Sequence, residues 1–387
     1  MVRINKKIVV IIVVVIIVIL FCLGLLFNTG RLQKGKLFSK PIQKQSTTTT
    51  VASRLNNDQI ADLLLQWANN TRTENGGYAE GEWCTNKGVC DPFFVDNRIG
   101  AVGLWARFKH YLKYQDSESM SIMAKDILIY SDPQKVSTIQ PVFWNCKLLY
   151  ELWKSPLFSQ AQKNNIENIC ARSVYATLDL TYNQNVSIPE TSLNQITQQM
   201  AGKGQRNQLF FFNEQVDVSM SSEYAAFASD YAGMYQWAQD KEDLKRAQIS
   251  FIAAVSALRN NINLFQLTEM APLVGLASLD LNKITPNPLY VQYADWLIKQ
   301  YKNTSCPQLQ GCVMRAFLYN ELYKLNKKEE YRQERDKIIS KLYDERFDYK
   351  GLSGFRIGKG AFYDSLTKNQ YMMVSNTVLA GLLLDMQ

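Results

Sequence analysis

Apolar side chains recur every three or four residues along most of the chain from Leu55 to the C-terminus. Ala247, Phe251, Ala254 and Leu258 form one such stripe. This spacing places side chains on one face of an α-helix, whereas a half-buried strand would alternate apolar and polar positions. We find no alternating run of β-branched residues that predicts a strand. The pattern therefore predicts an all-α fold.

The stripes define about twelve helices, separated by loops. The predicted helices span residues 58–70, 96–114, 116–130, 140–154, 158–180, 219–238, 241–259, 266–279, 288–302, 310–325, 327–343 and 369–386. Pro272 is expected to begin or kink the eighth helix, because proline has no main-chain N–H to donate within a helix.

Charge divides these helices into two kinds. The seventh and eleventh helices carry six and ten charged residues, whereas the sixth, eighth and twelfth together carry four. A helix with few charges on any side belongs inside a fold, and a highly charged helix belongs at its rim. Because the even-numbered helices are mostly the uncharged ones, we expect inner and outer helices to alternate along the chain.

Loop lengths show a second regularity. Connections from even to odd helices are mostly short, whereas the long odd-to-even connections cover residues 71–95, 131–139, 181–218 and 344–368. In a succession of antiparallel helices, all odd-to-even connections emerge at the same end. One end of the fold should therefore be built from long loops, and binding sites favour such an end.

Alternating inner and outer helices with one elaborated end resemble an α/α toroid of six hairpins. Residues 55–387 are similar in this helix pattern to the six-hairpin glycosidase superfamily, without the signature residues of a particular family. The resemblance implies an (α/α)6 toroid whose pocket lies at the long-loop end of the inner ring. An α-helical repeat array or an irregular helical bundle is the alternative architecture.

Residues 8–27 form an uncharged apolar run that fits a membrane span. At about 1.5 Å per residue, such a helix would extend about 30 Å, the thickness of the hydrocarbon core. The run is too long for a cleaved signal peptide, and no small-residue cleavage site follows it. We therefore expect a short basic tail at 1–7, a transmembrane anchor at 8–27, a flexible polar stalk at 28–54 and the toroid domain at 55–387.

Two features disagree about the side of the membrane on which the domain lies. Three basic residues precede the anchor and five follow it closely, which mildly favours a large domain inside the cell. The six domain cysteines, however, fall into the plausible pairs Cys84–Cys90, Cys146–Cys170 and Cys306–Cys312, which is typical of an oxidising compartment. A zinc site built from the two C-x5-C pairs, or free buried thiols, are the alternatives. We expect disulfides, and hence a single-pass cell-membrane protein whose C-terminal domain is extracytoplasmic.

The formal net charge of +8 does not point to a nucleic-acid partner. Nine of the 43 Lys and Arg residues lie in residues 1–54, which contain no acid, so the domain holds 34 basic and 35 acidic residues. A neutral domain without a basic stripe is a poor match for DNA or RNA. The sole histidine, His110, disfavours histidine-ligated zinc and histidine-dependent triads. No complete phosphate-binding loop is present, so we expect neither a metal nor a cofactor.

The long loops are rich in carboxylates and aromatic rings, the side chains that sugar sites use. Glycoside hydrolysis needs two carboxylates that flank the scissile bond. The candidate catalytic residues are Glu223, Asp91 and Asp96, and the candidate substrate-binding residues are Trp83, Tyr78, Tyr224, Tyr363 and Asp364.

Structural roles also account for most of these carboxylates. Asp96 lies where a helix N-cap belongs, and Asp91 precedes a proline in a small loop, which is a common turn arrangement. Glu223 falls in the first turn of an inner helix, where the helix dipole favours an acid. Asp364 lies just before a capping box for the last helix. Asp230, seven residues after Glu223, fits a core acid whose carboxyl group is hydrogen-bonded within the protein.

The sequence thus predicts a membrane-anchored extracytoplasmic toroid that binds or processes a glycan at its long-loop face. A glycoside hydrolase with paired carboxylates is one form of this hypothesis. A non-catalytic surface protein that binds a glycan or a cell-surface protein partner with the same fold is the alternative. A cytoplasmic domain with reduced cysteines is a third hypothesis.

Overall fold

The computed structural model describes residues 54–72, 78–84, 90–96, 99–132, 134, 145–175, 221–260, 271–348, 360–364 and 370–386. Every described residue lies in one compact unit, Ser53–Gln387. The predicted tail (1–7), anchor (8–27) and stalk (28–54) therefore fall outside the described residues, apart from Arg54. Among the residues that are described, no helix combines the length and apolarity that a membrane crossing requires.

Twelve helices occur in the described residues, one for each helix that the sequence predicts. They are α2 (Asn57–Asn70), α3 (Ile99–Tyr114), α4 (Ser117–Ser131), α5 (Asn145–Lys154), α6 (Gln160–Tyr175), α8 (Ser221–Ala238), α9 (Lys241–Asn260), α11 (Ala271–Ile284), α12 (Pro288–Tyr301), α13 (Leu309–Asn326), α14 (Glu329–Arg346) and α15 (Met373–Asp385). The eighth helix, α11, both begins and ends five residues later than predicted. Pro272 lies in its first turn, where a missing N–H leaves no helical hydrogen bond unmade.

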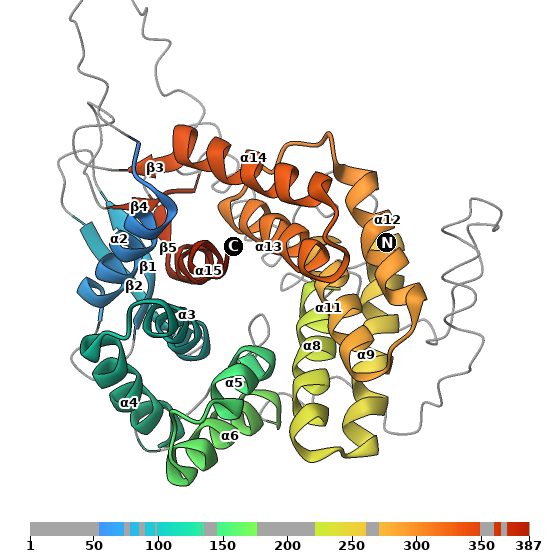
Figure 1. The fold of residues 1–387 in the computed structure, drawn as a ribbon, viewed down its shortest axis with the longest axis horizontal. Helices are drawn as coiled ribbons and strands as arrows, with labels where there is room; N and C mark the ends of the chain where they lie inside the picture. Colours follow the sequence, from blue (N-terminus) through green and yellow to red (C-terminus); the bar gives the residue numbers. More distant parts are fainter. Residues whose placement is uncertain are drawn as a thin grey trace, which may run out of the picture. The chain divides into compact units, whose positions relative to one another are not determined.

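Six of these helices form a closed inner ring. α3 contacts α5, α5 contacts α8, and the series continues through α11, α13 and α15 back to α3. The other six pack around the outside, as Figure 1 shows: α4, α6, α9, α12 and α14 each pack on the inner helix directly before them, and α2 packs on the last helix, α15. The predicted alternation of inner and outer helices is confirmed, and the fold is an α/α toroid.

Burial follows the charge pattern that predicted this arrangement. In the inner helix α13, every residue from Gly311 to Leu322 is buried, so the helix has no solvent-facing stripe. In the outer helix α14, the buried positions include Tyr331, Arg335 and Ile339, which recur at helical spacing and form a single inward stripe. Apart from Arg335 and Arg346, the charges of α14 lie on its remaining faces.

Local signals set several helix starts. The Asn56 side chain accepts a hydrogen bond from the Gln59 N–H at 2.9 Å, and the Gln59 side chain accepts one from the Asn56 N–H, so a capping box begins α2. The Asp116 side chain caps α4 by accepting a hydrogen bond from the Ser119 N–H. Asn287 caps α12, which has Pro288 as its first residue.

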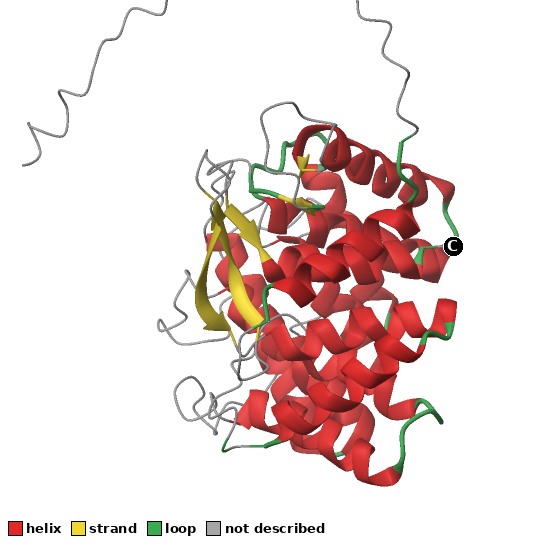
Figure 2. Cartoon of the chain, turned by 90° about the vertical axis from the view of Figure 1, so that its left-hand side faces the viewer, coloured by secondary structure: helices red, strands yellow, loops and turns green. Residues whose placement is uncertain are grey.

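Strands are present, contrary to the expectation of an all-helical chain. β1 (Tyr78–Cys84) pairs in antiparallel fashion with β2 (Cys90–Asp96) and with β5 (Gln370–Met372), and β3 (Phe347–Asp348) pairs with β4 (Ala361–Phe362). All five lie in connections that lead into inner helices, and Figure 2 shows the longer strands at one end of the helices. The strands are short, and β1 pairs with β5, which lies almost at the other end of the chain. Local periodicity therefore does not reveal them.

Three disulfides form as the sequence predicts: Cys84–Cys90, Cys146–Cys170 and Cys306–Cys312. Cys84–Cys90 closes the β1–β2 hairpin, and Cys146–Cys170 joins α5 to its outer neighbour α6. The alternative of a four-thiolate zinc site is wrong for this structure, because all four sulfurs of the two C-x5-C pairs are bonded to each other in pairs.

Candidate functional site

The two ends of the ring differ in their connections. The segments that lead into inner helices, among them residues 71–98, 302–308 and 347–372, emerge at the N-terminal ends of those helices. The segments that leave the inner helices, such as 115–116 and 239–240, are short and emerge at the opposite end. We call these the long-connection end and the short-connection end. The candidate residues from the sequence lie at the long-connection end.

Trp83 is the most exposed aromatic side chain of the described long-connection end, with 51% of its surface accessible. It lies on β1, the central strand of the three-stranded sheet. The register places Asp91 of β2 directly opposite Trp83 on one side and Gln370 of β5 opposite it on the other. The sheet thus aligns an exposed indole with a candidate carboxylate position and an amide position.

Glu82, the neighbour of Trp83, is only 8% exposed. Its Oε2 accepts a hydrogen bond from the indole Nε1 of Trp67 on α2 at 2.9 Å. The side chains of Glu82, Cys84 and Cys90 lie within 4.8 Å of one another, but both sulfurs belong to a disulfide and supply no thiolate for a metal. Glu82 therefore ties the strand to the outer ring and leaves Trp83 pointing to solvent on a fixed support.

Tyr78 was expected to contact substrate, and the structure instead places it in the core with 1% exposure. Its hydroxyl donates to Asp126 Oδ2 of α4 at 3.0 Å and accepts from Arg72, which also forms an ion pair with Asp126. Burial and the Asp126 charge raise the pKa of Tyr78. The ring offers no face to a ligand, because its contacts join β1 to α3 and α4.

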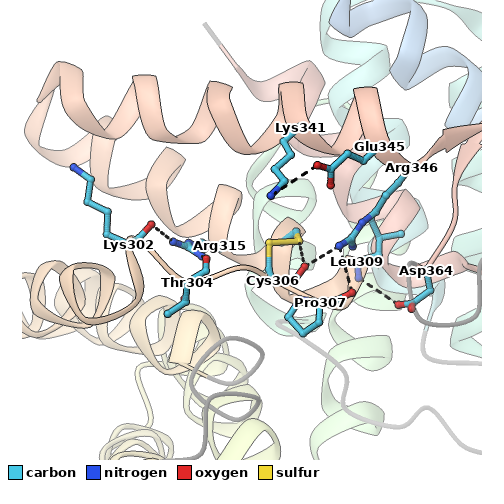
Figure 3. The surroundings of a disulfide bond; sticks show 11 residues. Lys302, Thr304, Cys306, Pro307, Leu309, Arg315, Lys341, Glu345, Arg346 and Asp364 are labelled. Atoms are coloured by element: carbon cyan, nitrogen blue, oxygen red, sulfur yellow. Dashed lines mark hydrogen bonds and ion pairs between the residues drawn. A yellow bond between two sulfur atoms is a disulfide. The ribbon is translucent and has the colours of Figure 1, made fainter.

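Tyr224, Tyr363 and Asp364 are buried as well, with 6%, 4% and 9% exposure. The Tyr363 hydroxyl donates to the Glu345 carbonyl oxygen. Asp364 Oδ2 accepts from the Leu309 N–H at 3.3 Å, so this carboxylate caps the start of α13 from a distant segment (Figure 3). Through these two hydrogen bonds, Tyr363 and Asp364 join segments of the long-connection end.

Two buried arginines fix the connection between α12 and α13. Arg315 donates to the carbonyl oxygens of Lys302 and Thr304 at 2.7 and 2.8 Å, and Arg346 donates to that of Cys306 at 2.8 Å. Figure 3 shows both guanidinium groups pointing at this connection beside the Cys306–Cys312 disulfide. The rim of the long-connection end is therefore rigidly held here.

The backbone positions of the candidate catalytic residues are described, but their side chains are not. Glu223 lies in the first turn of α8, as predicted. Asp91 and Asp96 both lie on β2, and Asp96 pairs with Tyr78. Asp96 is not the N-cap of α3, because that helix begins three residues later, at Ile99. The catalytic role of all three residues stays a prediction.

A charged network that the sequence did not reveal lies inside the ring, toward the short-connection end. Four lysines and four carboxylates from five inner helices take part: Lys109, Lys147, Lys283, Lys324, Glu151, Asp280, Glu321 and Asp385. The signal was present, because these are eight of the twelve charged residues on five otherwise apolar helices. Their convergence depends on ring closure, which no local pattern encodes.

The ion pairs of this network run from helix to helix. Lys109 of α3 contacts Glu151 of α5 at 2.7 Å and Asp385 of α15 at 2.9 Å. Lys283 of α11 contacts Glu321 of α13 at 2.8 Å. Burial opposes charge on all these groups, yet the ion pairs raise the pKa of Lys283 and Lys109 and hold that of Glu321 well below its usual range.

Asp230 on α8 is a further acidic residue of the inner ring and is completely buried. Its Oδ1 accepts from the Cys146 N–H at 2.9 Å, at the start of α5, and its Oδ2 has no hydrogen-bond partner among the described residues. Burial and the nearby Asp280 charge raise the pKa of Asp230 to about 8. Asp230 is therefore protonated near neutral pH. We expected a core acid whose two oxygens are both hydrogen-bonded, and only one of them is.

No protein-family model matches the chain, and no curated protein matches it in sequence. Solved structures do match its fold. They include the Lin0763 protein of Listeria innocua, with a TM-score of 0.53 and 12% identity over 85% of this chain and 97% of that one. The glycoside hydrolase family 76 mannosidase Bt3792 of Bacteroides thetaiotaomicron VPI-5482 matches with a TM-score of 0.52 and 9% identity over 85% and 97%.

A sugar epimerase from a ruminal bacterium matches with a TM-score of 0.51 and 8% identity, over 84% of this chain and 97% of that one. At such identities the matches describe the fold alone. This chain thus shares its fold with these three structures, and its helices form the α/α toroid that their pattern in the sequence indicated.

Proposed function

We propose that residues 53–387 form a glycan-binding toroid whose ligand lies across the long-connection end. The exposed Trp83 carries this proposal. An indole with half of its surface in solvent, held on a sheet that a disulfide and the Trp67–Glu82 hydrogen bond fix in place, is suited to stack on the C–H face of a sugar ring. The positions of Asp91 and Gln370 beside it suit hydrogen bonds to sugar hydroxyls.

The fold supports a carbohydrate ligand in a weaker way. Among the three similar structures, one is named as a mannosidase and one as a sugar epimerase. The toroid is thus a scaffold on which sugar sites are known, and the site of this chain has to be argued from its own residues.

A glycoside hydrolase is the second candidate function. It would use Glu223 together with Asp91 or Asp96, because hydrolysis needs one carboxylate as acid and a second as nucleophile or base. The position of Glu223 in the first turn of an inner helix, at the end where the ligand would lie, favours this assignment.

The proposed setting is the outer surface of a cell membrane. Residues 8–27 would anchor the chain and residues 28–54 would space the domain from the bilayer. The three disulfides support an oxidising, extracytoplasmic location.

Substitution of Trp83 tests glycan binding. The full-length chain in detergent is applied to an array of immobilised glycans, and Trp83→Ala is compared with Leu128→Ala, which removes a side chain of 58% exposure from the outer helix α4. We expect Trp83→Ala to weaken binding about tenfold or more, because the stacking surface is lost. Leu128→Ala should bind as the wild type does. Equal binding by all three chains would exclude Trp83 from the site.

Substitution of Glu223 separates the two candidate functions. If the chain is a hydrolase, Glu223→Gln should abolish release of reducing ends from the bound glycan and leave the melting temperature nearly unchanged. A wild-type chain that binds its glycan and releases no product supports the non-catalytic function. Retained turnover in Glu223→Gln would remove Glu223 from the mechanism.

A further inference from the structure

A groove of about 480 Å³ lies between the connection from α12 to α13 and the outer helix α14. Residues 302–307 line one side of it, and residues of α14 between Glu334 and Arg346 line the other. Figure 3 shows this region, in which Lys341 extends from α14 toward the Cys306–Cys312 disulfide. The volume is within the range of pockets that hold small molecules. We call this site the α14 groove.

Positive charge is in excess in the α14 groove. The charged side chains in its described lining are five bases and two acids: Lys302, Arg315, Lys337, Lys341, Arg346, Glu334 and Glu345. Two further acids of α14 lie outside the lining and face other arginines. Asp336 contacts Arg335 at 2.8 Å, and Asp344 faces Arg54 at 3.9 Å. These two acids therefore do not offset the excess, which favours an anionic ligand.

The two arginines of the groove have a structural part. Arg315 and Arg346 are buried, and they donate to carbonyl oxygens of the connection from α12 to α13. They hold the wall of the groove in place and add positive charge behind it. We therefore assign them no direct contact with a ligand.

The three lysines, in contrast, are accessible from solvent. The exposed fractions of the side chains are 46% for Lys302, 77% for Lys337 and 62% for Lys341. Each ammonium group carries three hydrogen-bond donors on a flexible stem. The lysines are thus the groups of the groove that can reach a ligand.

The carboxylates of the groove hold these lysines only weakly. Glu334 lies 3.6 Å from the Lys302 ammonium and 3.9 Å from that of Lys337, and Glu345 lies 3.8 Å from that of Lys341. Charge-assisted hydrogen bonds are about 2.7–2.9 Å long, so none of these contacts is one. Exposed ion pairs of this kind contribute little stability. An anion in the groove can therefore replace them at little cost.

We propose that the α14 groove binds a small organic phosphate monoester. Such an ester carries about two negative charges near neutral pH, spread over three oxygens, which suits several lysines that act as point charges. A carboxylate is best held by the planar fork of an arginine, and both arginines of the groove donate to main-chain carbonyls instead. The partly buried Ile338 offers apolar surface for the carbon skeleton of the ester.

Titration calorimetry of the full-length chain in detergent tests the proposal with three probes that share a sugar ring. They are glucose 6-phosphate, glucuronate and glucose. We expect glucose 6-phosphate to bind, glucuronate to bind at least about tenfold more weakly and glucose to give no signal. The affinity for glucose 6-phosphate should fall as the salt concentration is raised, because salt screens exposed charges.

Trp83→Ala separates this site from the proposed glycan face. No residue of the sheet that carries Trp83 lines the α14 groove. The Trp83→Ala chain should therefore bind glucose 6-phosphate as the wild type does. The proposal does not depend on the glycan face, and either site can fail its test while the other passes.

Lys341→Gln and Lys299→Gln form a matched pair of variants. Both side chains are 62% exposed and each faces a carboxylate four residues away, but only Lys341 lines the groove. Lys341→Gln should weaken glucose 6-phosphate binding about tenfold, because a charge-assisted hydrogen bond to the phosphate is lost. Lys299→Gln should leave the affinity unchanged. Equal melting temperatures would show that both variants keep the fold.

Glu334→Gln should have the opposite effect. It removes the carboxylate that competes with the ligand for Lys302 and Lys337, so glucose 6-phosphate should bind severalfold more tightly. A purely structural role of these charges would not give tighter binding.

Three results would overturn the proposal. One is that glucose 6-phosphate at millimolar concentration does not bind, or binds no more tightly than glucuronate. Another is an equal affinity of the Lys341→Gln and Lys299→Gln chains. The third is a folded Glu334→Gln chain that binds glucose 6-phosphate no better than the wild type.

Discussion

The ionisation of Asp230 is coupled to the fold by burial. Its carboxyl group is fully buried between α8 and α5, and its pKa lies at about 8 instead of the ordinary 3.8. Between these two values the folded chain binds one more proton than the unfolded chain. The free energy of unfolding should therefore fall as the pH rises through this window.

Asp230→Asn tests this coupling. The amide oxygen can still accept from the Cys146 N–H, and the side chain no longer ionises, so the part of the pH dependence due to this residue disappears. We expect the variant to gain on the order of 3 kcal/mol relative to the wild type between pH 5 and pH 8. Urea unfolding at both pH values measures the gain. Asp344→Asn, at a side chain of 63% exposure, is the control and should change neither value.

At the scale of residues, the sequence predicted positions better than roles. All three disulfide pairs follow from the parity and spacing of the cysteines. Tyr78 and Asp364, in contrast, resemble ligand-binding residues only by their position in long loops. Their partners, Asp126 and the Leu309 N–H, lie 48 and 55 residues away along the chain. No local sequence pattern predicts such contacts.

At the scale of elements, the contact between the last helix and the second helix closes the ring. Gly381 of α15 faces the Trp105 ring of α3 so closely that an added Cβ would overlap the indole. Gly103 of α3 is the natural comparison, because a Cβ there would meet the Tyr78 ring at 3.6 Å, an ordinary contact distance.

The two glycines predict opposite outcomes for the same substitution. Gly381→Ala should lower the free energy of unfolding by about 2 kcal/mol, because overlap with Trp105 forces α15 away from α3. Gly103→Ala should be neutral or raise it by up to about 1 kcal/mol, since alanine favours a helix over glycine. Denaturant unfolding of both variants gives the comparison. Equal destabilisation would show that α15 does not pack on α3 in this way.

The helices were predictable because each carries its own apolar stripe, and the strands were not. β1 contains two glutamates and a glycine among its seven residues, and only its pairing with β2 and β5 makes it a strand. For the same reason, the sequence did not predict the sheet that supports Trp83. The residue itself could be selected from the sequence, but the sheet that holds it depends on a segment almost three hundred residues away.

At the scale of the whole molecule, location and fold are linked through the disulfides. In intact cells, a membrane-impermeant thiol reagent should label the domain only after reduction. Cys90 and Cys306 should react first, because they are only partly buried, whereas Cys84 and Cys146 are fully buried. Labelling that requires a breached membrane and no reductant would place the domain in the cytoplasm, as the charges flanking residues 8–27 suggest.

Footprinting of Trp83 tests whether a glycan binds across the long-connection end. Hydroxyl radicals oxidise exposed side chains, and mass spectrometry measures the rate at Trp83 with and without a saturating glycan chosen from the array. We predict that bound glycan protects Trp83 severalfold and leaves Leu128 on the outer ring unaffected, since both side chains are more than half exposed in the free protein. If Trp83 is oxidised at the rate of the free protein while a glycan saturates the chain, the glycan does not lie across the long-connection end.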